Sequence, residues 1–425
     1  MNRIVKIKGG RILDPSQGID GFGDVWMQGG VIINAPQDET SMYVETIDAS
    51  GFWVCPGLID AHVHLREPGQ EAKEDIASGL RAAARGGFTA VMPMPNTSPA
   101  NDSPALTRMM IEKAEALGGT RVYPVAAATV GRKGETVADL AALKAAGAKA
   151  FSDDGSAVVD DAVMAEVLRR CKELDMPFSQ HAEDPAIVKG GVLHDGPTAK
   201  RLGVPGWPSE GESRIVERDI ALAESLGASV HVGHVSTSAS VAAIRAAKAR
   251  GVRVTGEAAP HHLLLTDKIA ESAGTLAKVN PPLRPESDVD ACVKGLRDGT
   301  LDIAATDHAP HTDRDKSGGF VNAAFGMVGL ETAVPLLLIL VERGDLSPMR
   351  LIEAMSTLPA RIFHLPGGTL APGAPADITL INSTSPHTVE PATFVSKSRN
   401  TPFAGFKVPG RAVMTIVGGK VVYRD

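Results

Sequence analysis

Hydrophobic and polar positions follow two different patterns along the chain, and the change between them comes near residue 55. Before it, short apolar and β-branched runs are separated by glycine-containing turns, which is typical of β-strands. After it, short apolar runs alternate with alanine-rich stretches of helical periodicity, which predicts β-α units around a parallel sheet. The strands expected in the first part are residues 4–7, 25–27, 31–33 and 44–47.

The second part contains eight such apolar runs with helical segments between them, as in a (β/α)8 barrel. One expected helix, residues 74–85, is followed by Gly86-Gly87, because glycine commonly ends a helix. The expected barrel strands are residues 58–64, 89–92, 122–126, 148–152, 178–181, 229–234, 253–256 and 303–306. After Gly367 strand-like runs return at residues 377–381, 412–417 and 420–422.

The predicted fold is therefore α/β: a (β/α)8 TIM barrel with a flanking β-sandwich built from both termini. We expect residues 1–55 to form the N-terminal part of the sandwich, residues 56–366 the barrel, and residues 367–425 the C-terminal part of the sandwich. A chain of 425 residues is long enough for one large barrel and an accessory unit.

Composition and charge exclude several classes of function. The net charge is −7 with no block of like charges, so no nucleic-acid surface is expected. The N-terminus lacks the apolar region of a signal peptide, and the longest apolar run, residues 333–341, is too short to span a bilayer, so no membrane is expected. Cys55, Cys171 and Cys292 form neither a disulfide framework nor a metal motif, and we expect a cytoplasmic protein.

The sequence His62-Val63-His64 ends the first expected barrel strand. Alternate residues of a strand share a face, so the two imidazoles point the same way and suit a zinc-type metal. Arg66 continues that face with a cation that matches a carboxylate. A pair of structural histidines is the alternative for this motif alone.

Other polar residues stand at the carboxyl ends of further expected strands, where TIM barrels carry their active sites. An isolated histidine there is usually structural, but four histidines and two carboxylates at one rim predict a metal site. Nitrogen and oxygen ligands without thiolates suit zinc and leave manganese, cobalt or iron open. The polar residues that we single out at or just beyond these strand ends are His62, His64, Asn96, Asp153, Asp154, His181, His234, Asp307 and His311.

Other histidines lie nearby but are expected outside the metal site. His261 and His262 are adjacent, and on an extended chain adjacent side chains face opposite ways, so we interpret this pair as structural or as supporting the ligands. His231 precedes His234 by three residues, and this odd spacing predicts that it faces away from the site.

Several motifs together resemble the metal-dependent amidohydrolase superfamily and, within it, dihydroorotases of the long bacterial type. The resemblance extends over nearly the whole chain, and the first 50 residues add little to it. The motifs are Pro-Gly-Leu-Ile-Asp-Ala-His-Val-His-Leu-Arg (56–66), Met-Pro-Asn-Thr (94–97), Phe-Ser-Asp-Asp-Gly (151–155), Gly-His-Val-Ser-Thr (233–237), Thr-Asp-His-Ala-Pro-His (306–311) and Ser-Arg-Asn-Thr-Pro-Phe-Ala-Gly (398–405).

This resemblance implies a zinc-dependent enzyme with one or two ions per chain. It implies reversible cyclisation of N-carbamoyl-L-aspartate to L-dihydroorotate and water, a step of pyrimidine (UMP) biosynthesis, with Asp307 as general acid and base. Asp153 is the less expected ligand, because the family's bridging residue is the second of the pair. The implied metal ligands are His62, His64 and Asp307 for one ion, His181 and His234 for the other, and Asp154 between them. The implied substrate contacts are His64, Arg66, Asn96, Asn280, His311, Phe325 and Gly326.

Related cyclic amidohydrolases remain alternatives. Hydantoinases, dihydropyrimidinases, allantoinases and many dihydroorotases bridge their metals with a carboxylated lysine after strand 4, where this chain has Asp153-Asp154. Lys149 precedes Asp154 by five residues, about 16 Å of extended chain at ~3.3 Å per residue, and on the other face. A bridging aspartate is therefore favoured.

A third alternative is an inactive homologue that serves as a subunit of aspartate transcarbamoylase. Such a protein is expected to lose metal ligands, and all six are present here. The resemblance also allows an active enzyme to associate with aspartate transcarbamoylase, and we expect a homo-oligomer.

Overall fold

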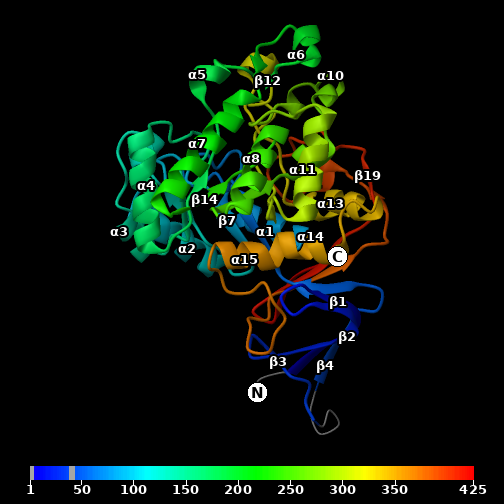
Figure 1. Cartoon of the computed structure of the whole chain (residues 1–425). Coiled ribbons are helices and arrows are strands. Elements are labelled where there is room, and N and C mark those ends of the chain that lie inside the picture. Colours follow the sequence, from blue (N-terminus) through cyan, green and yellow to red (C-terminus); the bar gives the residue numbers. More distant parts are fainter. Residues whose placement is uncertain (1–3, 38–43) are drawn as a thin grey trace.

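The computed structural model describes residues 4–37 and 44–425. Figure 1 shows a barrel surrounded by helices, with a smaller β unit below it. The strands of this lower unit come from both ends of the chain, as predicted. They are β1 (Ile4–Asp14), β2 (Ile19–Gln28), β3 (Val31–Ile33), β4 (Val44–Asp48), β5 (Trp53–Pro56), β17 (Ile378–Asn382), β20 (Arg411–Val417) and β21 (Lys420–Arg424).

Hydrogen bonds join these eight strands in the order β21-β20-β17-β5-β1-β2-β3, with β4 also on β1. Strand β1 changes partners along its length: its first residues pair with β4, and Arg11 and Ile12 pair with β5. The register of β1 against β2 shifts between these parts, where Gly9 has a φ of +73°, a value that favours glycine. The sheet can therefore close over one apolar core, which confirms the expected sandwich. That core includes Ile7, Met27, Ile47, Ile378, Leu380 and Ile416.

The barrel strands pair in parallel in the predicted order, and a bridge between Val63 and His308 joins the last to the first. The expected third strand is two short ones, because Pro124 between them has no N–H to donate. The barrel strands are β6 (Leu58–Val63), β7 (Phe88–Pro93), β8 (Arg121–Val122) with β9 (Val125–Ala127), β10 (Ala150–Ser152), β11 (Ser179–Gln180), β14 (Ser229–Val232), β15 (Arg253–Ala258) and β16 (Ile303–Ala304).

The first barrel helix, α1 (Ile76–Gly86), shows how these elements end. Asp75 caps its start by accepting from the Ser78 N–H, and Gly87, with a φ of +95°, ends it. The other helices are α2 (Pro104–Leu117), α3 (Leu140–Ala145), α4 (Asp161–Leu174), α5 (Pro185–Val188), α6 (Pro197–Leu202), α7 (Glu210–Leu226), α8 (Ser238–Ala249), α9 (Pro260–Leu264), α10 (Ala270–Ala273), α11 (Glu286–Asp298), α12 (Gly319–Asn322), α13 (Ala333–Glu342), α14 (Pro348–Ile352) and α15 (Leu358–Ile362). Among the described residues, no helix is both long and apolar enough to cross a bilayer.

Two insertions shape the barrel. The chain after β11 forms α5, α6 and the pair β12 (Leu193–His194) with β13 (Gly206–Trp207), at the top of Figure 1. Between β17 and β20 the chain leaves the sandwich and forms β18 (His387–Thr388) and β19 (Lys407–Val408). There Phe403 packs in one cluster with Met327 and Leu336 of the barrel. The division at residues 55 and 366 stays a prediction.

A close contact fixes the start of β6, the strand that carries the two histidines of the His-x-His motif. Gly57 separates β5 from β6, and a Cβ atom there would lie 2.2 Å from Thr89 Oγ1. The Thr379 hydroxyl of the sandwich donates to the carbonyl of Gly87 at 2.6 Å and accepts from the Leu58 N–H at 3.3 Å. The sandwich thus holds the lower end of β6, and with it the direction in which His62 and His64 emerge.

Candidate metal centre

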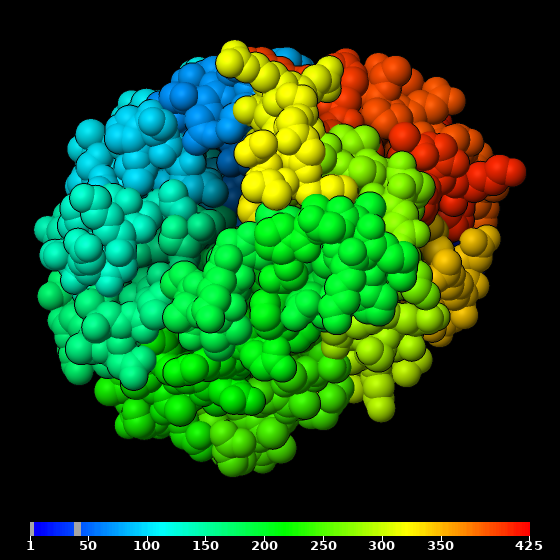
Figure 2. Space-filling model, turned by 90° about the horizontal axis from the view of Figure 1, so that it is seen from above, coloured from blue at the N-terminus to red at the C-terminus, as the bar shows by residue number. Residues whose placement is uncertain are grey.

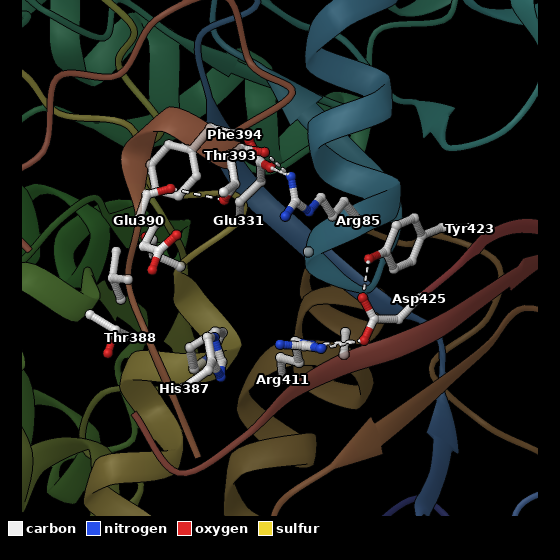
Figure 3. A pocket seen from close by; sticks show the side chains of 15 residues that line it. Arg85, Glu331, His387, Thr388, Glu390, Thr393, Phe394, Arg411, Tyr423 and Asp425 are labelled. Atoms are coloured by element: carbon white, nitrogen blue, oxygen red, sulfur yellow. Dashed lines mark hydrogen bonds and ion pairs between the residues drawn. The ribbon is translucent and has the colours of Figure 1, made fainter. Parts of the chain in front are cut away.

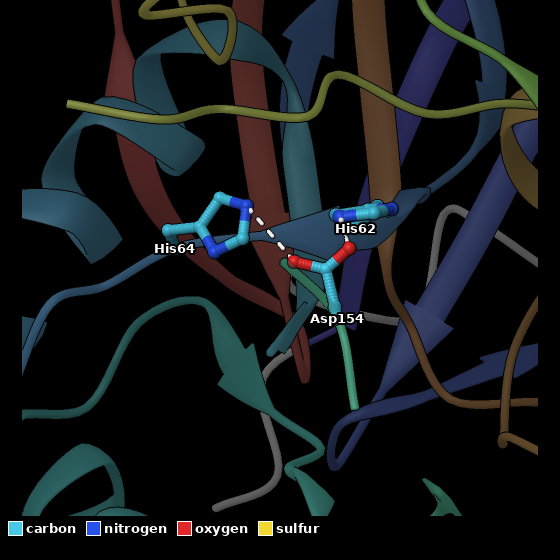
Figure 4. A group of neighbouring side chains, drawn as sticks. All are labelled: His62, His64 and Asp154. Carbon is cyan, nitrogen blue, oxygen red and sulfur yellow. Dashed lines mark ion pairs between the residues drawn. The ribbon is translucent and has the colours of Figure 1, made fainter. Parts of the chain in front are cut away.

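Six buried side chains meet at the carboxyl-terminal mouth of the barrel, and they are the six predicted ligands. Asp154 lies among the histidines: its Oδ1 is 3.3 Å from His62 Nε2, 3.4 Å from His181 Nδ1 and 3.5 Å from His234 Nε2. Its Oδ2 is 3.6 Å from His64 Nε2. Figure 4 shows His62 and His64 turned toward the two oxygens of this carboxylate. The possible ligand atoms form two groups, and within each group they all lie within 4.8 Å of one another: His62, His64 and Asp154 in one, and Asp154, His181 and His234 in the other.

Asp307 completes the first group. Its Oδ1 is 3.0 Å from His64 Nε2 and 3.6 Å from His62 Nε2. Asp307 and His234 have φ values of +47° and +32°, and such left-handed conformations are uncommon for residues other than glycine. Both follow the end of a barrel strand, so this turn of the backbone directs each side chain back over the mouth. Strain of this kind persists only where surrounding contacts hold it, as at functional sites.

Hydrogen bonds on the outer side of the rings leave the inner nitrogens free to bind a metal. His62 Nδ1 lies 2.6 Å from Glu257 Oε1, His64 Nδ1 lies 2.8 Å from Asn96 Oδ1, and His181 Nε2 lies 3.0 Å from Glu183 Oε2. Each of these oxygens accepts the ring N–H, so the other nitrogen presents its lone pair to Asp154. His62 Nε2 is buried without a hydrogen-bond partner in the described residues. The donor set therefore fits one or two divalent cations of the zinc type.

Electrostatics favour a cation at the same place. Burial opposes charge on every group, but the surrounding histidines outweigh it and hold the pKa of Asp154 and of Asp307 below the usual range. The pKa of His62 is raised well above its usual value because Asp154 and Glu257 face it, although burial acts in the opposite sense. The carboxylates thus stay ionised, and their negative charge needs a positive partner.

Asp153 is excluded from the cluster by its hydrogen bonds, as its less favoured status predicted. Its Oδ1 accepts from the N–H groups of Ala128 and Thr129 at 2.9 and 3.0 Å, and its Oδ2 accepts from the Thr129 hydroxyl. Asp153 therefore joins the ends of β9 and β10. Its neighbour Asp154 then faces the barrel axis.

Two statements about other histidines were wrong in their geometry. His261 and His262 lie in helix α9 rather than on an extended chain; neither is among the clustered ligands, and His262 Nε2 contacts the Pro281 carbonyl at 2.9 Å. His231 does not face away from the site: its Nε2 is 3.2 Å from Glu257 Oε2, below the metal cluster. The prediction from alternating side chains fails because β14 ends at Val232, so the backbone at His234 is no longer extended and its side chain does not obey the alternation.

Sequence reasoning missed Glu257, which supports both halves of the cluster. Glu257 is 2% exposed on β15; its Oε1 contacts His62 Nδ1 and also accepts from the His234 N–H at 3.2 Å. A carboxylate directly after the expected strand 253–256, at the same end as the other site residues, was the available signal.

Asn400 was missed as well, although it lies in the quoted motif at 398–405. Its Oδ1 accepts from the His311 N–H at 3.0 Å, and its Nδ2 donates to the carbonyls of Ala309 and Gly326, both at 3.1 Å. The C-terminal segment therefore orders the loop after β16.

A cavity of about 180 Å³ lies beside the ligand cluster. Figure 2 shows this end of the molecule, where the yellow segment after β16 stands next to a hollow. The cavity is lined by every residue predicted to contact substrate, namely His64, Arg66, Asn96, Asn280, His311, Phe325 and Gly326. Besides His64, four further predicted ligands line it, Asp154, His181, His234 and Asp307, together with Gly155 and Ala309. Their proximity agrees with a binding site; their individual contacts stay predictions.

Arg66 is the cation of this cavity. It is 8% exposed, its Nε donates to the Pro310 carbonyl at 3.2 Å, and within the described ranges it forms no ion pair with a carboxylate. Burial lowers the pKa of Arg66 to about 10, so the guanidinium remains charged at neutral pH. A buried cation without an anionic partner is costly, and a ligand carboxylate would supply that partner.

A larger cavity, about 400 Å³, lies between α1 and the C-terminal strands, and both of its arginines are already paired with carboxylates (Figure 3). Arg85 Nη1 lies 3.2 Å from Glu331 Oε1, and Arg411 Nε donates to Asp425 Oδ2 at 2.9 Å. Among the described residues the metal-ligand clusters lie only at the barrel mouth, so that mouth is the candidate site.

Comparisons with known proteins agree with this site. The family model described as dihydro-orotase-like matches residues 51–240. The dihydroorotase of Anaeromyxobacter sp. (strain K) is 49% identical over 428 residues, covering 100% of this chain and 99% of that protein. The dihydroorotase of Pelotomaculum thermopropionicum is 50% identical over 420 residues, covering 99% of this chain and 98% of that protein.

Solved structures share the fold over the whole chain at lower identity. The L-hydantoinase (dihydropyrimidinase) from Arthrobacter aurescens has a TM-score of 0.88 at 26% identity and covers 100% of this chain and 96% of that one. The D-hydantoinase (dihydropyrimidinase) from Thermus sp. has a TM-score of 0.82 at 27% identity, covering 99% and 95%.

Exchanging each aspartate of the pair for asparagine separates their roles. We expect Asp154→Asn to bind less zinc per chain, because it removes the charge among the ligand histidines. Asp153→Asn should bind as much zinc as the unmodified protein but lose about 1–3 kcal/mol of unfolding free energy, because it weakens buried hydrogen bonds. Elemental analysis and urea denaturation measure the two effects, and the reverse pattern would show that Asp153 is the ligand.

Proposed function

Because the chain belongs to the dihydroorotase family, it is a metal-dependent cyclic amidohydrolase, and we propose in detail how its residues interconvert N-carbamoyl-L-aspartate and L-dihydroorotate. The observation that carries the proposal is the cluster of six predicted ligands beside a cavity lined by a buried arginine that has no carboxylate partner among the described residues. The chain is also about half identical to bacterial dihydroorotases along its whole length.

We propose zinc as the metal, held by the ligand atoms that the hydrogen bonds leave free. His62, His64 and Asp307 would hold one ion, His181 and His234 a second, and Asp154 would lie between them. When bound, zinc supplies water that ionises near neutral pH and polarises the amide carbonyl. The nitrogen and oxygen donors without thiolate fit this metal.

Asp307 is placed for the proton transfers of the reaction. It belongs to the ligand cluster and also lines the cavity, so its carboxylate can reach both the attacking water and the substrate. In hydrolysis it accepts a proton from the water and delivers it to the ring nitrogen as the amide C–N bond breaks. In cyclisation the same carboxylate takes the proton from the ureido nitrogen and returns it as water leaves.

Arg66 would select the anionic substrate. Dihydroorotate carries a carboxylate that neutral hydantoins lack, and the guanidinium is buried in the cavity wall without a carboxylate of its own in the described residues. A bidentate, charge-assisted contact would satisfy it. Asn96 and His311 line the same cavity and would complete the carboxylate site.

The hydantoinase, dihydropyrimidinase and allantoinase alternatives lack support at two positions. They require a carboxylated lysine, and Lys149 lines a different cavity together with Gly118, Arg121 and Val422. They also act on rings without the carboxylate that Arg66 would bind. The catalytically inactive alternative is disfavoured because all six ligands converge.

We further propose a cytoplasmic homo-oligomer that can associate with aspartate transcarbamoylase. The three cysteines are buried and unpaired, which supports a reducing compartment. The family resemblance supports the association.

Turnover of the purified protein tests the proposed function. We expect it to cyclise carbamoylaspartate and to hydrolyse dihydroorotate, to lose both activities after chelation, and to regain them with zinc. Ring closure converts a dianion to a monoanion and consumes a proton, so the equilibrium ratio should shift toward dihydroorotate by about tenfold per pH unit of acidification. Faster hydrolysis of hydantoin or allantoin than of dihydroorotate, or full turnover after chelation, would contradict the proposal.

Removing the guanidinium tests substrate recognition. Arg66→Ala should raise the KM for dihydroorotate by about 10- to 150-fold, which corresponds to about 1.5–3 kcal/mol for a charge-assisted hydrogen bond. Zinc content should stay unchanged, because Arg66 is not a ligand. Arg314→Ala, an exposed arginine in the loop after β16, is the matched control. Equal KM values for the two variants would remove Arg66 from the site.

Asp307→Asn tests the proton transfer. The change keeps the size of the side chain but removes its basicity, and we expect kcat to fall by at least about 100-fold. Zinc content must be measured in the same sample, since Asp307 is also a proposed ligand. A metal-loaded variant with full kcat would show that another group moves the proton.

A further inference from the structure

Glu183 contacts both a predicted metal ligand, His181, and a residue of the cavity wall, Asn280. It follows the ligand His181 by two residues, and its Oε2 lies 3.0 Å from His181 Nε2 and 2.6 Å from Asn280 Nδ2. His181 ends β11, whereas Asn280 belongs to the chain between β15 and β16. One carboxylate oxygen therefore joins two rim segments that are distant in the sequence.

The chemistry of these contacts fixes their direction. A carboxylate accepts hydrogen bonds and donates none, so both partners must offer hydrogens. His181 must carry its proton on Nε2, which leaves the Nδ1 lone pair toward Asp154. Asn280 must turn its NH₂ group to Glu183, which determines the place of its carbonyl oxygen.

That carbonyl oxygen, Asn280 Oδ1, accepts no hydrogen bond from any described residue. Asn280 lines the cavity of about 180 Å³, and its Oδ1 is buried without a hydrogen bond in the described part of the chain. Leaving such an oxygen unpaired costs about 1–3 kcal/mol, and a buried orphan of this kind requires an explanation. A bound ligand that brings an N–H group provides one.

We propose that Glu183 is a positioning residue that orients the Asn280 amide so that Oδ1 accepts a hydrogen bond from an N–H of the cyclic amide substrate. The same carboxylate keeps His181 directed to the metal centre. This inference deepens the proposed function and rests on it: the dihydroorotate ring offers such N–H groups, and a ring alkylated on nitrogen offers fewer.

A double-mutant cycle on the two residues tests this directly. Asn280→Ala removes the amide, and Glu183→Ala removes the carboxylate that orients it. If Glu183 acts through Asn280, the double variant Glu183→Ala/Asn280→Ala binds ligand no more weakly than Asn280→Ala alone. If the two residues act independently, their effects on binding add in the double variant.

The measurements are the Kd of orotate, which has the same carboxylate and ring N–H groups but cannot be hydrolysed, and the KM and kcat for dihydroorotate, all on zinc-loaded protein. We expect Asn280→Ala and Glu183→Ala each to raise Kd and KM by about tenfold or more. Glu183→Gln keeps an accepting carbonyl and should raise them by about threefold, and the double variant should bind no more weakly than Asn280→Ala. Glu217→Ala, an exposed carboxylate on α7, is the control without effect.

The inference is overturned if Glu183→Ala binds orotate as tightly as the unmodified protein, or if the two substitutions weaken binding additively. Should Glu183→Ala fail to fold, the same cycle with Glu183→Gln in its place decides. If the unmodified, zinc-loaded protein neither turns over dihydroorotate nor binds orotate, the proposed function itself fails. Turnover with additive effects in the double variant refutes only the positioning role.

Discussion

The structure depends on one electrostatic constraint: lone pairs and carboxylate charge are concentrated in a buried space from which water is largely excluded. The outer nitrogens of three ligand histidines are already engaged by Glu257, Asn96 and Glu183, so their hydrogens point away from the centre. The inner nitrogens and the oxygens of Asp154 and Asp307 therefore face one another without enough protons to share. A divalent cation satisfies all of them, whereas the unpaired groups would be costly to bury.

A second layer of carboxylates holds this arrangement and closes the barrel beneath it. Glu257 connects His62 of strand β6 with the backbone of His234 after β14. Asp60 precedes His62 by two residues on β6, and its carboxylate accepts hydrogen bonds from the N–H and the hydroxyl of Thr306 at 3.0 and 2.6 Å. These contacts link the first strand to the sixth, seventh and eighth. These contacts also hold the left-handed backbone at His234 and Asp307. That conformation is unfavourable for both residues, and it persists because the surrounding fold stabilises it.

The barrel, the sandwich and the six clustered side chains were predictable from the sequence, because strand periodicity places residues at a rim and the motifs identify that rim. The ends of individual strands and helices, and the directions in which their side chains point, were less predictable. The assumption of an extended chain failed for His261 and for His231, since a short helix and the early end of β14 intervene. Glu257 escaped notice because its partner His62 is 195 residues away, and no local pattern encodes such a contact.

The fold alone does not choose the substrate, since hydantoinases share the barrel and sandwich. In our proposal the choice falls to a few side chains around the cavity, above all to Arg66, which is buried and forms no ion pair with a carboxylate among the described residues. Their placement depends on the far end of the chain: Asn400 fixes His311 and the backbone at Gly326, and it does so from the segment that leaves the sandwich to pack on the barrel. The accessory unit thus helps to order the wall of the cavity. It shares this task with Lys278, whose Nζ donates to the carbonyls of Phe320 and Ala323 in the loop after β16. The shape of the cavity therefore depends on the C-terminal segment from one side and on the chain between β15 and β16 from the other.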